Sequence, residues 1–222
     1  MNFRKLIDHT MLRPEATSKD IEALVAQAKE HQFGAICLNS SWIKYAKELI
    51  GDDPIDIVAV VGFPLGANIT QNKVHEAELA IKHGASEIDM VINIGKFKEK
   101  NYEYITNEIQ QIKKAIGNHV LKVIVETALL ITQEIAKATE IVVKAKADFI
   151  KTSTGFSYRG ASFEDVKIMA EVAQGKIAIK AAGGIKSISD LEEFYRLGAT
   201  RFGTSSSLAV FGLTKTKKGD SY

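Results

Sequence analysis

Short apolar runs alternate along the chain with longer amphipathic stretches. The runs are rich in β-branched residues, which is typical of buried parallel strands. They lie at 6–10, 35–38, 55–63, 88–94, 120–125, 149–154, 177–182 and 201–204. Eight expected strands therefore recur at intervals of roughly 23 to 33 residues.

The stretches between these runs have the apolar spacing of helices. Positions i, i+3, i+4 and i+7 share one helical face, which then packs on a core. This spacing is seen at Ile21, Leu24, Val25 and Ala28, and a spacing of four, three and four at Ile105, Ile109, Ile112 and Ile116. The Gly-Ala pairs that begin at Gly34, Gly84 and Gly198 each end a helical stretch. We expect these glycines to take the left-handed conformation that ends helices.

A chain that alternates strands with helices predicts parallel strands joined by right-handed crossovers. Eight units in 222 residues match the short end of the (β/α)8 TIM barrel. A doubly wound open sheet is the alternative, but it would usually have fewer strands. No linker interrupts the sequence, so we expect one domain over 1–222, with a mobile C-terminal tail at 212–222.

Composition and charge exclude several classes of protein. The 29 basic and 27 acidic residues nearly balance, which argues against nucleic-acid binding. No apolar run is long enough to span a membrane, and the N-terminus lacks a signal-peptide core. The single cysteine, Cys37, excludes an intrachain disulfide and favours a reducing compartment, so we expect a cytoplasmic protein.

Charged residues interrupt the expected strands, where a covered parallel sheet should be apolar. They are Asp8, Asp89, Lys122, Glu126, Lys151 and Lys180. Each one alone is explained by a structural salt bridge or by a strand end near water. Three lysines from three successive strands would, however, crowd around one barrel axis. Such crowding lowers the pKa of one ammonium group and favours a nucleophilic amine, which predicts Schiff-base chemistry on a carbonyl substrate.

Small residues follow several of the expected strands. Gly183 and Gly184 come after the seventh strand, and Ser205 and Ser206 after the eighth. In barrels of this type these two loops commonly bind phosphate through backbone N–H groups. Gly155, after the sixth strand, is a candidate third wall of the same site.

Other reactive groups carry less information. The five histidines never approach the spacing of metal ligands, and Cys37 lies in an apolar run that suits an inert core thiol. We therefore expect neither a metal nor a cofactor. A tail that ends in Tyr222 could fold over the barrel mouth, but a frayed terminus is the preferred interpretation.

Taken together, these segments resemble the deoxyribose-phosphate aldolase family. The resemblance covers about residues 5–210 and rests on Ile7-Asp-His-Thr, the stretch 73–95, Leu121-Lys-Val-Ile-Val-Glu-Thr, Phe149-Ile-Lys-Thr-Ser-Thr-Gly-Phe, Lys180-Ala-Ala-Gly-Gly-Ile and Phe202-Gly-Thr-Ser-Ser. It implies a metal-free class I aldolase that reversibly cleaves 2-deoxy-D-ribose 5-phosphate to acetaldehyde and D-glyceraldehyde 3-phosphate in deoxyribonucleoside breakdown.

The resemblance also implies roles for individual residues. Lys151 matches the Schiff-base lysine, Lys180 the second active-site lysine, and Asp89 the proton-relaying aspartate. The phosphate-binding backbone would come from Gly155, Gly183, Gly184, Ser205 and Ser206. The positions of Asp8, Lys122 and Glu126, and not the resemblance, predict a secondary polar network. A purely structural role explains Asp8 about equally well, and Glu126, four residues beyond Lys122 on the same strand face, is expected to pair with Lys122 or with Lys151.

Two rival functions follow from the same residues. A phosphosugar epimerase or isomerase would use a metal cluster or a carboxylate pair without an imine-forming lysine. A non-catalytic phosphosugar-binding barrel would keep the glycine loops but has no use for crowded lysines. The partner is in either case a small phosphosugar. A homodimer or higher homo-oligomer is compatible with the sequence, but no surface pattern identifies the contact.

Overall fold

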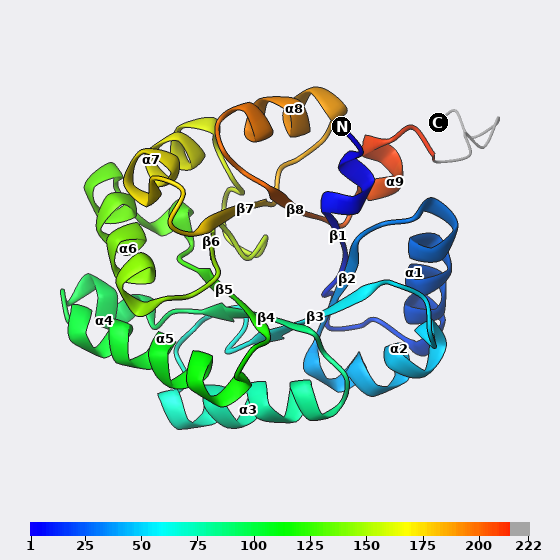
Figure 1. Ribbon diagram of the computed structural model, residues 1–222, viewed down its shortest axis with the longest axis horizontal. Helices are drawn as coiled ribbons and strands as arrows, with labels where there is room; N and C mark the ends of the chain where they lie inside the picture. Colours follow the sequence, from blue (N-terminus) through cyan, green and yellow to red (C-terminus); the bar gives the residue numbers. More distant parts are fainter. Residues whose placement is uncertain (214–222) are drawn as a thin grey trace.

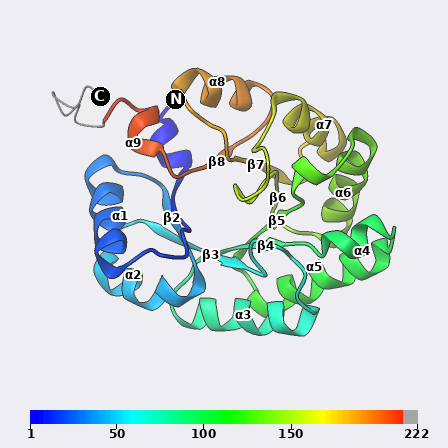
Figure 2. The same cartoon turned by 180° about the vertical axis from the view of Figure 1, so that it is seen from behind.

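Eight parallel strands pair in sequence order and close into a barrel, because the last strand pairs with the first. The computed structural model describes residues 1–213 of the chain. The strands are β1 (Ile7–Met11), β2 (Ala35–Leu38), β3 (Asp56–Val61), β4 (Glu87–Val91), β5 (Val120–Ile124), β6 (Phe149–Lys151), β7 (Ala178–Ala182) and β8 (Arg201–Thr204). Figures 1 and 2 show the barrel from its two ends, with helices around it. The expected (β/α)8 barrel is confirmed, and the open-sheet alternative is wrong.

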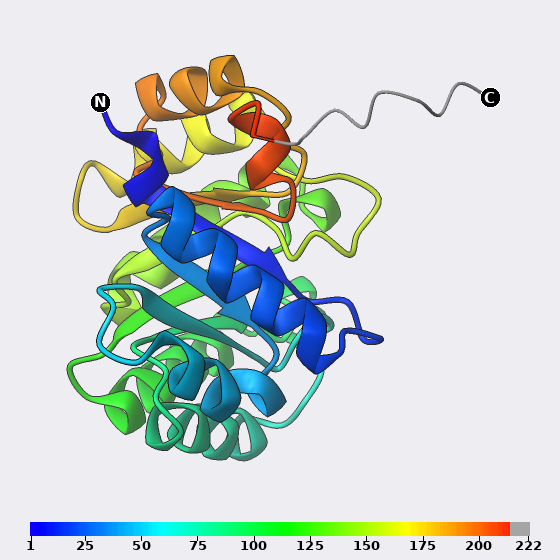
Figure 3. The ribbon, with the colours of Figure 1, turned by 90° about the vertical axis from the view of Figure 1, so that its right-hand side faces the viewer.

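The helices form the outer layer of the molecule. They are α1 (Ser18–His31), α2 (Ile43–Ile50), α3 (Thr70–Lys82), α4 (Ile94–Lys98), α5 (Tyr102–Ile116), α6 (Thr132–Ala145), α7 (Phe163–Ala173), α8 (Ile188–Arg196) and α9 (Ser207–Val210). The stripes predicted at 21–28 and 105–116 are buried in α1 and α5. Figure 3 shows α1 lying along β1 on the outside of the barrel. The main core therefore lies between the strands and the helices.

Three predicted strands extend past the ends of the observed ones. The runs at 55–63 and 149–154 contain β3 and β6 but extend beyond them, since β3 ends at Val61 and β6 at Lys151. The run at 88–94 begins one residue after β4 begins, at Glu87, and extends past its end at Val91. Residues beyond these ends belong to the loops that surround the barrel mouth. Apolar composition alone does not mark the point where ladder pairing stops.

The glycines after the helices fulfil the expectation in two cases of three. Gly84 and Gly198 both have φ of 112°, where a side chain would be strained. Gly34 does not have a positive φ, and Gln32 instead takes the left-handed position after α1. A Cβ on Gly34 would lie 2.2 Å from the carbonyl oxygen of Lys5, so close packing explains this glycine.

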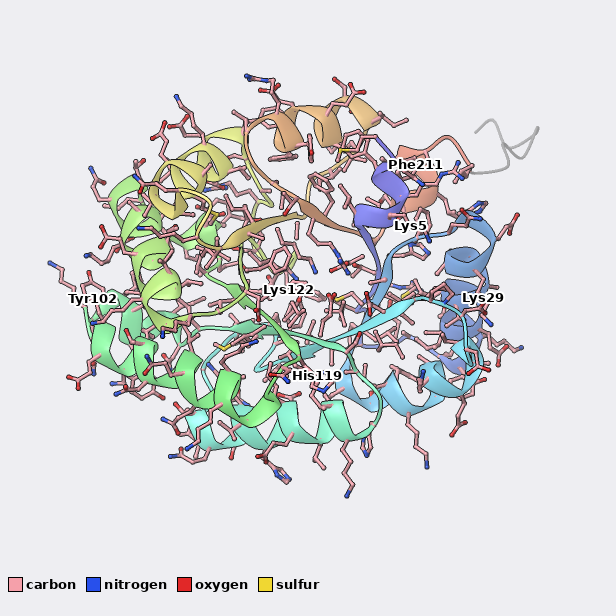
Figure 4. All side chains as sticks on the ribbon, in the orientation of Figure 1. Lys5, Lys29, Tyr102, His119, Lys122 and Phe211 are labelled. Carbon is pink, nitrogen blue, oxygen red and sulfur yellow. The ribbon has the colours of Figure 1, made fainter. Side chains whose placement is uncertain are left out.

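The inside of the barrel is divided into an apolar part and a charged part. Leu12, Ala35, Cys37, Val58 and Val60 form a small apolar cluster from the β1–β3 side. Charged side chains from β1 and from β4 to β8 fill the remainder, as described below. Figure 4 labels one of them, Lys122, within the ring of strands.

No helix among residues 1–213 is long and apolar enough to cross a membrane. The predicted tail at 212–222 lies outside the described residues from position 214 onward, including the proposed role of Tyr222.

Candidate active site

A cavity of about 430 Å³ opens at the carboxyl ends of the strands. It is lined by residues that follow β1, β6, β7 and β8, including Lys151 and all five candidate phosphate-binding residues. The five are Gly155, Gly183, Gly184, Ser205 and Ser206. The structure thus brings the expected nucleophile and the expected anion-binding loops into one cavity.

Backbone conformation explains the glycines in this cavity. Gly183 and Gly184 have φ of 76° and 77°, and Gly155 has φ of 89°. L-residues with side chains rarely adopt these values, so only glycine lets the loops turn here without strain. Gly160 allows a further close approach, because a Cβ on it would lie 2.4 Å from the Gly183 carbonyl oxygen.

The N–H groups of the five loop residues are not equally free. Gly183 donates to the Gly203 carbonyl oxygen at 3.3 Å, and the Ser206 N–H donates to Thr204 Oγ1 at 3.0 Å. The N–H groups of Gly155, Gly184 and Ser205 donate to no other described residue. These three N–H groups are therefore the ones available to an anion, whereas Gly183 contributes through the shape of its turn.

Lys151 ends β6 and points into the barrel, directly beside Lys180 of β7 in the strand register. Both amines donate to the same atom, Asp89 Oδ2, at 2.7 Å from Lys151 Nζ and 2.6 Å from Lys180 Nζ. All three side chains are buried, but only Lys151 lines the cavity. The amine that reaches the cavity is thus held by a carboxylate and crowded by a second ammonium group.

Five further contacts connect these groups to the rest of the barrel interior. Asp89 Oδ1 accepts from Lys122 Nζ at 3.0 Å, and Lys122 also donates to Glu87. Arg201 donates to Glu87 at 3.2 Å and to Asp8, and Asp8 accepts from Lys180. These ion pairs form a closed ring of alternating charge, in the order Arg201, Asp8, Lys180, Asp89, Lys122 and Glu87. We call these six residues the ion-pair ring.

The pKa values of Lys151 and Lys180 shift in opposite directions. Burial lowers the pKa of Lys151, and the neighbouring charge of Lys180 lowers it further, while Asp89 only partly opposes both. Burial would also lower the pKa of Lys180, but the carboxylates of Asp8 and Asp89 outweigh it and raise that pKa. Lys151 is therefore the amine that loses its proton more readily, and Lys180 remains an ammonium group.

Asp89 and Asp8 stay ionised although both are buried. Burial would raise the pKa of Asp89, but Lys122, Lys151 and Lys180 together hold it well below its usual range. The pKa of Asp8 is lowered in the same way, against its burial, by Lys180 and Arg201. Each buried acid thus has more than one cation beside it, which offsets the cost of taking its charge out of water.

Asp8 and Lys122 belong to the polar network that the sequence predicts, but Glu126 does not. The expected pairing of Glu126 with Lys122 or Lys151 is wrong, because its Oε2 accepts hydrogen bonds from the N–H and the hydroxyl of Thr154. The reason is local geometry: β5 ends at Ile124, and Glu126 has φ of 53°, which turns its side chain away from the strand alternation. Glu126 instead holds the loop that carries Gly155.

Sequence reasoning missed two members of the ring. Glu87 begins β4 two residues before Asp89, so alternation along the strand places both on the inner face. Arg201 begins β8, two residues before the glycine that faces Lys180. Arg201 lies inside the predicted strand 201–204, whereas Glu87 lies one residue before the predicted strand 88–94. The rule that identified the lysines could have found Arg201, and it could have found Glu87 with the strand extended by one residue.

Comparison with known proteins identifies the family of this chain. The sequence profile described as DeoC/LacD family aldolase matches residues 4–211. The chain is 59% identical over 220 residues to the deoxyribose-phosphate aldolase of Mesomycoplasma hyopneumoniae (strain J), covering 99% of this chain and 100% of that one.

The solved structures that are similar over 95% of the chain include the following two. One is an aldolase named QR15, with a TM-score of 0.91, 40% identity and 94% of its chain covered. The other, described as a unique tetrameric structure, is deoxyribose phosphate aldolase from Aeropyrum pernix, with a TM-score of 0.86, 30% identity and 89% covered.

Proposed function

The chain belongs to the DeoC/LacD family of aldolases and has the activity of a deoxyribose-phosphate aldolase, and from that premise we propose that it works through a Schiff base on Lys151. The observation that carries this proposal is the position of Lys151. Within the described chain it is the lysine of the buried network whose amine reaches the cavity, and its pKa is lowered by burial and by Lys180. A neutral amine at the cavity wall is the nucleophile that a carbonyl substrate requires.

In this proposal the substrate is 2-deoxy-D-ribose 5-phosphate in its open-chain form. Its phosphate is bound by the free N–H groups of Gly155, Gly184 and Ser205, which surround the cavity mouth. The Lys186 and Arg13 side chains line the same cavity and add positive charge to it. Anchoring the phosphate places the aldehyde carbon, at the other end of the sugar, near Lys151.

The amine of Lys151 attacks the C1 aldehyde, and loss of water gives an iminium ion. The C2–C3 bond then breaks, its electron pair moves into a C1–C2 double bond, and the cationic nitrogen becomes the neutral nitrogen of an enamine. The 3-hydroxyl gives up its proton as D-glyceraldehyde 3-phosphate forms. Protonation of the enamine at C2 and hydrolysis of the resulting iminium release acetaldehyde and regenerate Lys151.

Asp89 and Lys180 manage the protons of these steps. Asp89 receives the 3-hydroxyl proton, directly or through one water, since its Oδ2 lies 2.7 Å from the reacting amine. Its pKa is held far too low for the proton to stay, so the proton passes on through the lysines that surround it. Lys180 is an ammonium group before this step and donates the proton that the enamine takes up at C2.

Trapping the covalent intermediate tests this assignment. The protein is incubated with acetaldehyde or with deoxyribose 5-phosphate, reduced with borohydride, and mapped by peptide mass. We expect one adduct, on Lys151, and none in Lys151→Ala. An adduct on another lysine, or full cleavage activity in Lys151→Ala, would contradict the proposal.

The two rival functions predict different results in trapping, in a chelator and in a cleavage assay. A metal-dependent epimerase or isomerase would lose activity in a chelator and would form no adduct, whereas we expect activity without added metal to survive a chelator. A non-catalytic phosphosugar-binding barrel would bind the phosphosugar without cleaving it.

A role in deoxyribonucleoside breakdown, a cytoplasmic location and assembly into a homodimer or larger homo-oligomer remain part of the proposal. The tetrameric relative from Aeropyrum pernix makes the assembly state worth measuring by light scattering.

A further inference from the structure

The ion-pair ring is electrically balanced without Lys151. Its three cations, Arg201, Lys180 and Lys122, alternate with its three carboxylates, Asp8, Asp89 and Glu87. Lys151 is attached to the ring from outside, through Asp89. Loss of its proton therefore leaves no buried carboxylate without a cation.

Two members of the ring lie at the opposite end of their strands from the cavity. Arg201 and Glu87 are the first residues of their strands and lie toward the amino-terminal end of the barrel, whereas Lys151 is the last residue of β6. Neither lines the cavity, and neither is within ion-pair distance of Lys151. Each nevertheless contacts two oppositely charged members, and together they close the ring.

We propose that Glu87 and Arg201 are positioning residues that keep the ring neutral and so make Lys151 the one surplus cation of the barrel interior. This inference rests on the proposed function of Lys151 as the Schiff-base lysine. Removal of Arg201 would leave the ring with one excess negative charge, which would hold the proton on Lys151. Removal of the Glu87 charge would leave one excess positive charge, which would expel that proton more easily.

The other groups around Lys151 do not supply this balance. Cys37 faces it from β2 with a thiol whose pKa is raised by burial, so the thiol is neutral. The inner residues of β3, Val58 and Val60, are apolar. Glu126, beyond the end of β5, is bonded to Thr154, and Arg13 and Lys186 lie at the cavity mouth, where water screens their charges. The remaining interior charges are those of the ring. Asp8, Asp89, Lys122 and Lys180 cancel one another, so the ring stays neutral only while Glu87 and Arg201 balance each other.

The test measures the protonation of Lys151 itself instead of turnover. The rate at which acetaldehyde labels Lys151 is followed against pH, with cyanoborohydride trapping and peptide mass. We expect Glu87→Gln to move the acid limb of this profile to lower pH and Arg201→Gln to move it to higher pH. The shift should be about one pH unit in each direction, the size expected for one charge acting through several ångströms of protein interior.

Two further variants separate charge from structure. Arg201→Lys keeps the charge but changes the side chain, and we expect it to leave the acid limb in place. The double variant Glu87→Gln/Arg201→Gln restores neutrality, and we expect its limb to return toward that of the unaltered protein. Both variants also provide a readout if one of the single variants fails to fold.

The possible failures are distinguishable. If the unaltered protein gives no adduct on Lys151, the proposed function fails. If Lys151 is labelled but its acid limb stays fixed, or moves in the same direction in both single variants, the role given to Glu87 and Arg201 is wrong.

Discussion

Lys151 and Lys180 lie side by side across the β6–β7 ladder and donate to one carboxylate oxygen, Asp89 Oδ2. Two ammonium groups on one oxygen repel each other, so one of them releases its proton more easily than it would alone. The surroundings decide which one: Lys180 also bonds Asp8, whereas Lys151 pairs with Asp89 alone among the described residues. Lys180 is a member of the ion-pair ring and Lys151 lies outside it, and this difference separates the protonation of two lysines that occupy paired positions on neighbouring strands.

The first prediction concerns the charge of Lys180. Lys151 must be neutral to attack, so activity falls as pH drops through its pKa, which Lys180 helps to lower. In Lys180→Met that repulsion is gone, the pKa of Lys151 rises, and the acid limb of the kcat/KM profile moves to higher pH. The rate at the optimum also falls, roughly 10²-fold or more, because a proton donor is lost.

A charge-preserving variant separates these two effects. Lys180→Arg keeps a positive group but cannot release a proton, so we expect the acid limb to stay in place while the rate falls. An unchanged limb in Lys180→Met would show that Lys180 does not control Lys151.

The second prediction separates imine formation from bond cleavage. Asp89→Asn removes the proton acceptor but leaves the amine of Lys151, whose pKa falls when the carboxylate charge is lost. We expect acetaldehyde to label Lys151 at neutral pH, while cleavage of deoxyribose 5-phosphate drops by about 10² to 10⁴. Stability also falls, by about 3–5 kcal/mol, because the three lysines lose a shared buried counter-ion.

Thermal unfolding of the same variant provides the control. Labelling and unfolding together show whether the loss of cleavage comes from chemistry or from loss of the fold. Cleavage at the normal rate in a folded Asp89→Asn protein would remove Asp89 from the mechanism.

The third prediction concerns a buried ion pair outside the active site. Lys73 of α3 donates to Glu108 of α5 at 2.7 Å and to the Val91 carbonyl oxygen at 2.8 Å, and both charged side chains are fully buried. We expect Lys73→Met to lower the free energy of unfolding by about 3–5 kcal/mol, because it leaves the Glu108 charge unpaired. Urea unfolding measures this loss.

Removal of both charges provides the matched comparison. In Lys73→Met/Glu108→Gln the amide oxygen still accepts the N–H of Asn93, so the double variant should be more stable than Lys73→Met alone. Lys96→Met breaks the exposed pair with Glu99, where water screens both charges, and should change stability far less than Lys73→Met does. A double variant as unstable as the single one would mean that packing, and not charge, explains the loss.

The sequence predicts the barrel because an apolar run followed by an amphipathic stretch recurs eight times. One short strand such as β6, with three residues, does not change the spacing of these repeats. It predicts Lys151 and Lys180 because charges are conspicuous in buried strands. It does not predict the ring, because strand spacing says which residues face inward but not which of them meet. Glu126 shows the limit most clearly: a single left-handed residue after β5 sends its carboxylate to Thr154 instead of to a lysine.

Buried charge on helices is harder to recognise than buried charge on strands. Lys73 lies in an amphipathic stretch where lysine is ordinary, and nothing in the sequence distinguishes it from the exposed lysines of other helices. Its burial depends on Gly62, where a Cβ would lie 2.8 Å from its Cε, and on Glu108 from a helix 35 residues later. Such a pairing becomes visible only when the two helices are placed side by side.

The last prediction concerns the wall of the phosphate site. Gly160 does not have a positive φ, so alanine suits its backbone, but a Cβ there would lie 2.3 Å from the carbonyl carbon of Gly183. Gly160→Ala must therefore push apart the loops that follow β6 and β7, which carry Gly155 and Gly184. We expect KM for deoxyribose 5-phosphate to rise about tenfold or more, which corresponds to about 1.4 kcal/mol of lost binding.

Cleavage of unphosphorylated deoxyribose, which makes no use of these N–H groups, should change little. Gly95→Ala is the matched control, because its Cβ would make only an ordinary contact of 3.5 Å with Asn93. Equal losses on both substrates would mean that Gly160 supports the barrel as a whole and not its phosphate site.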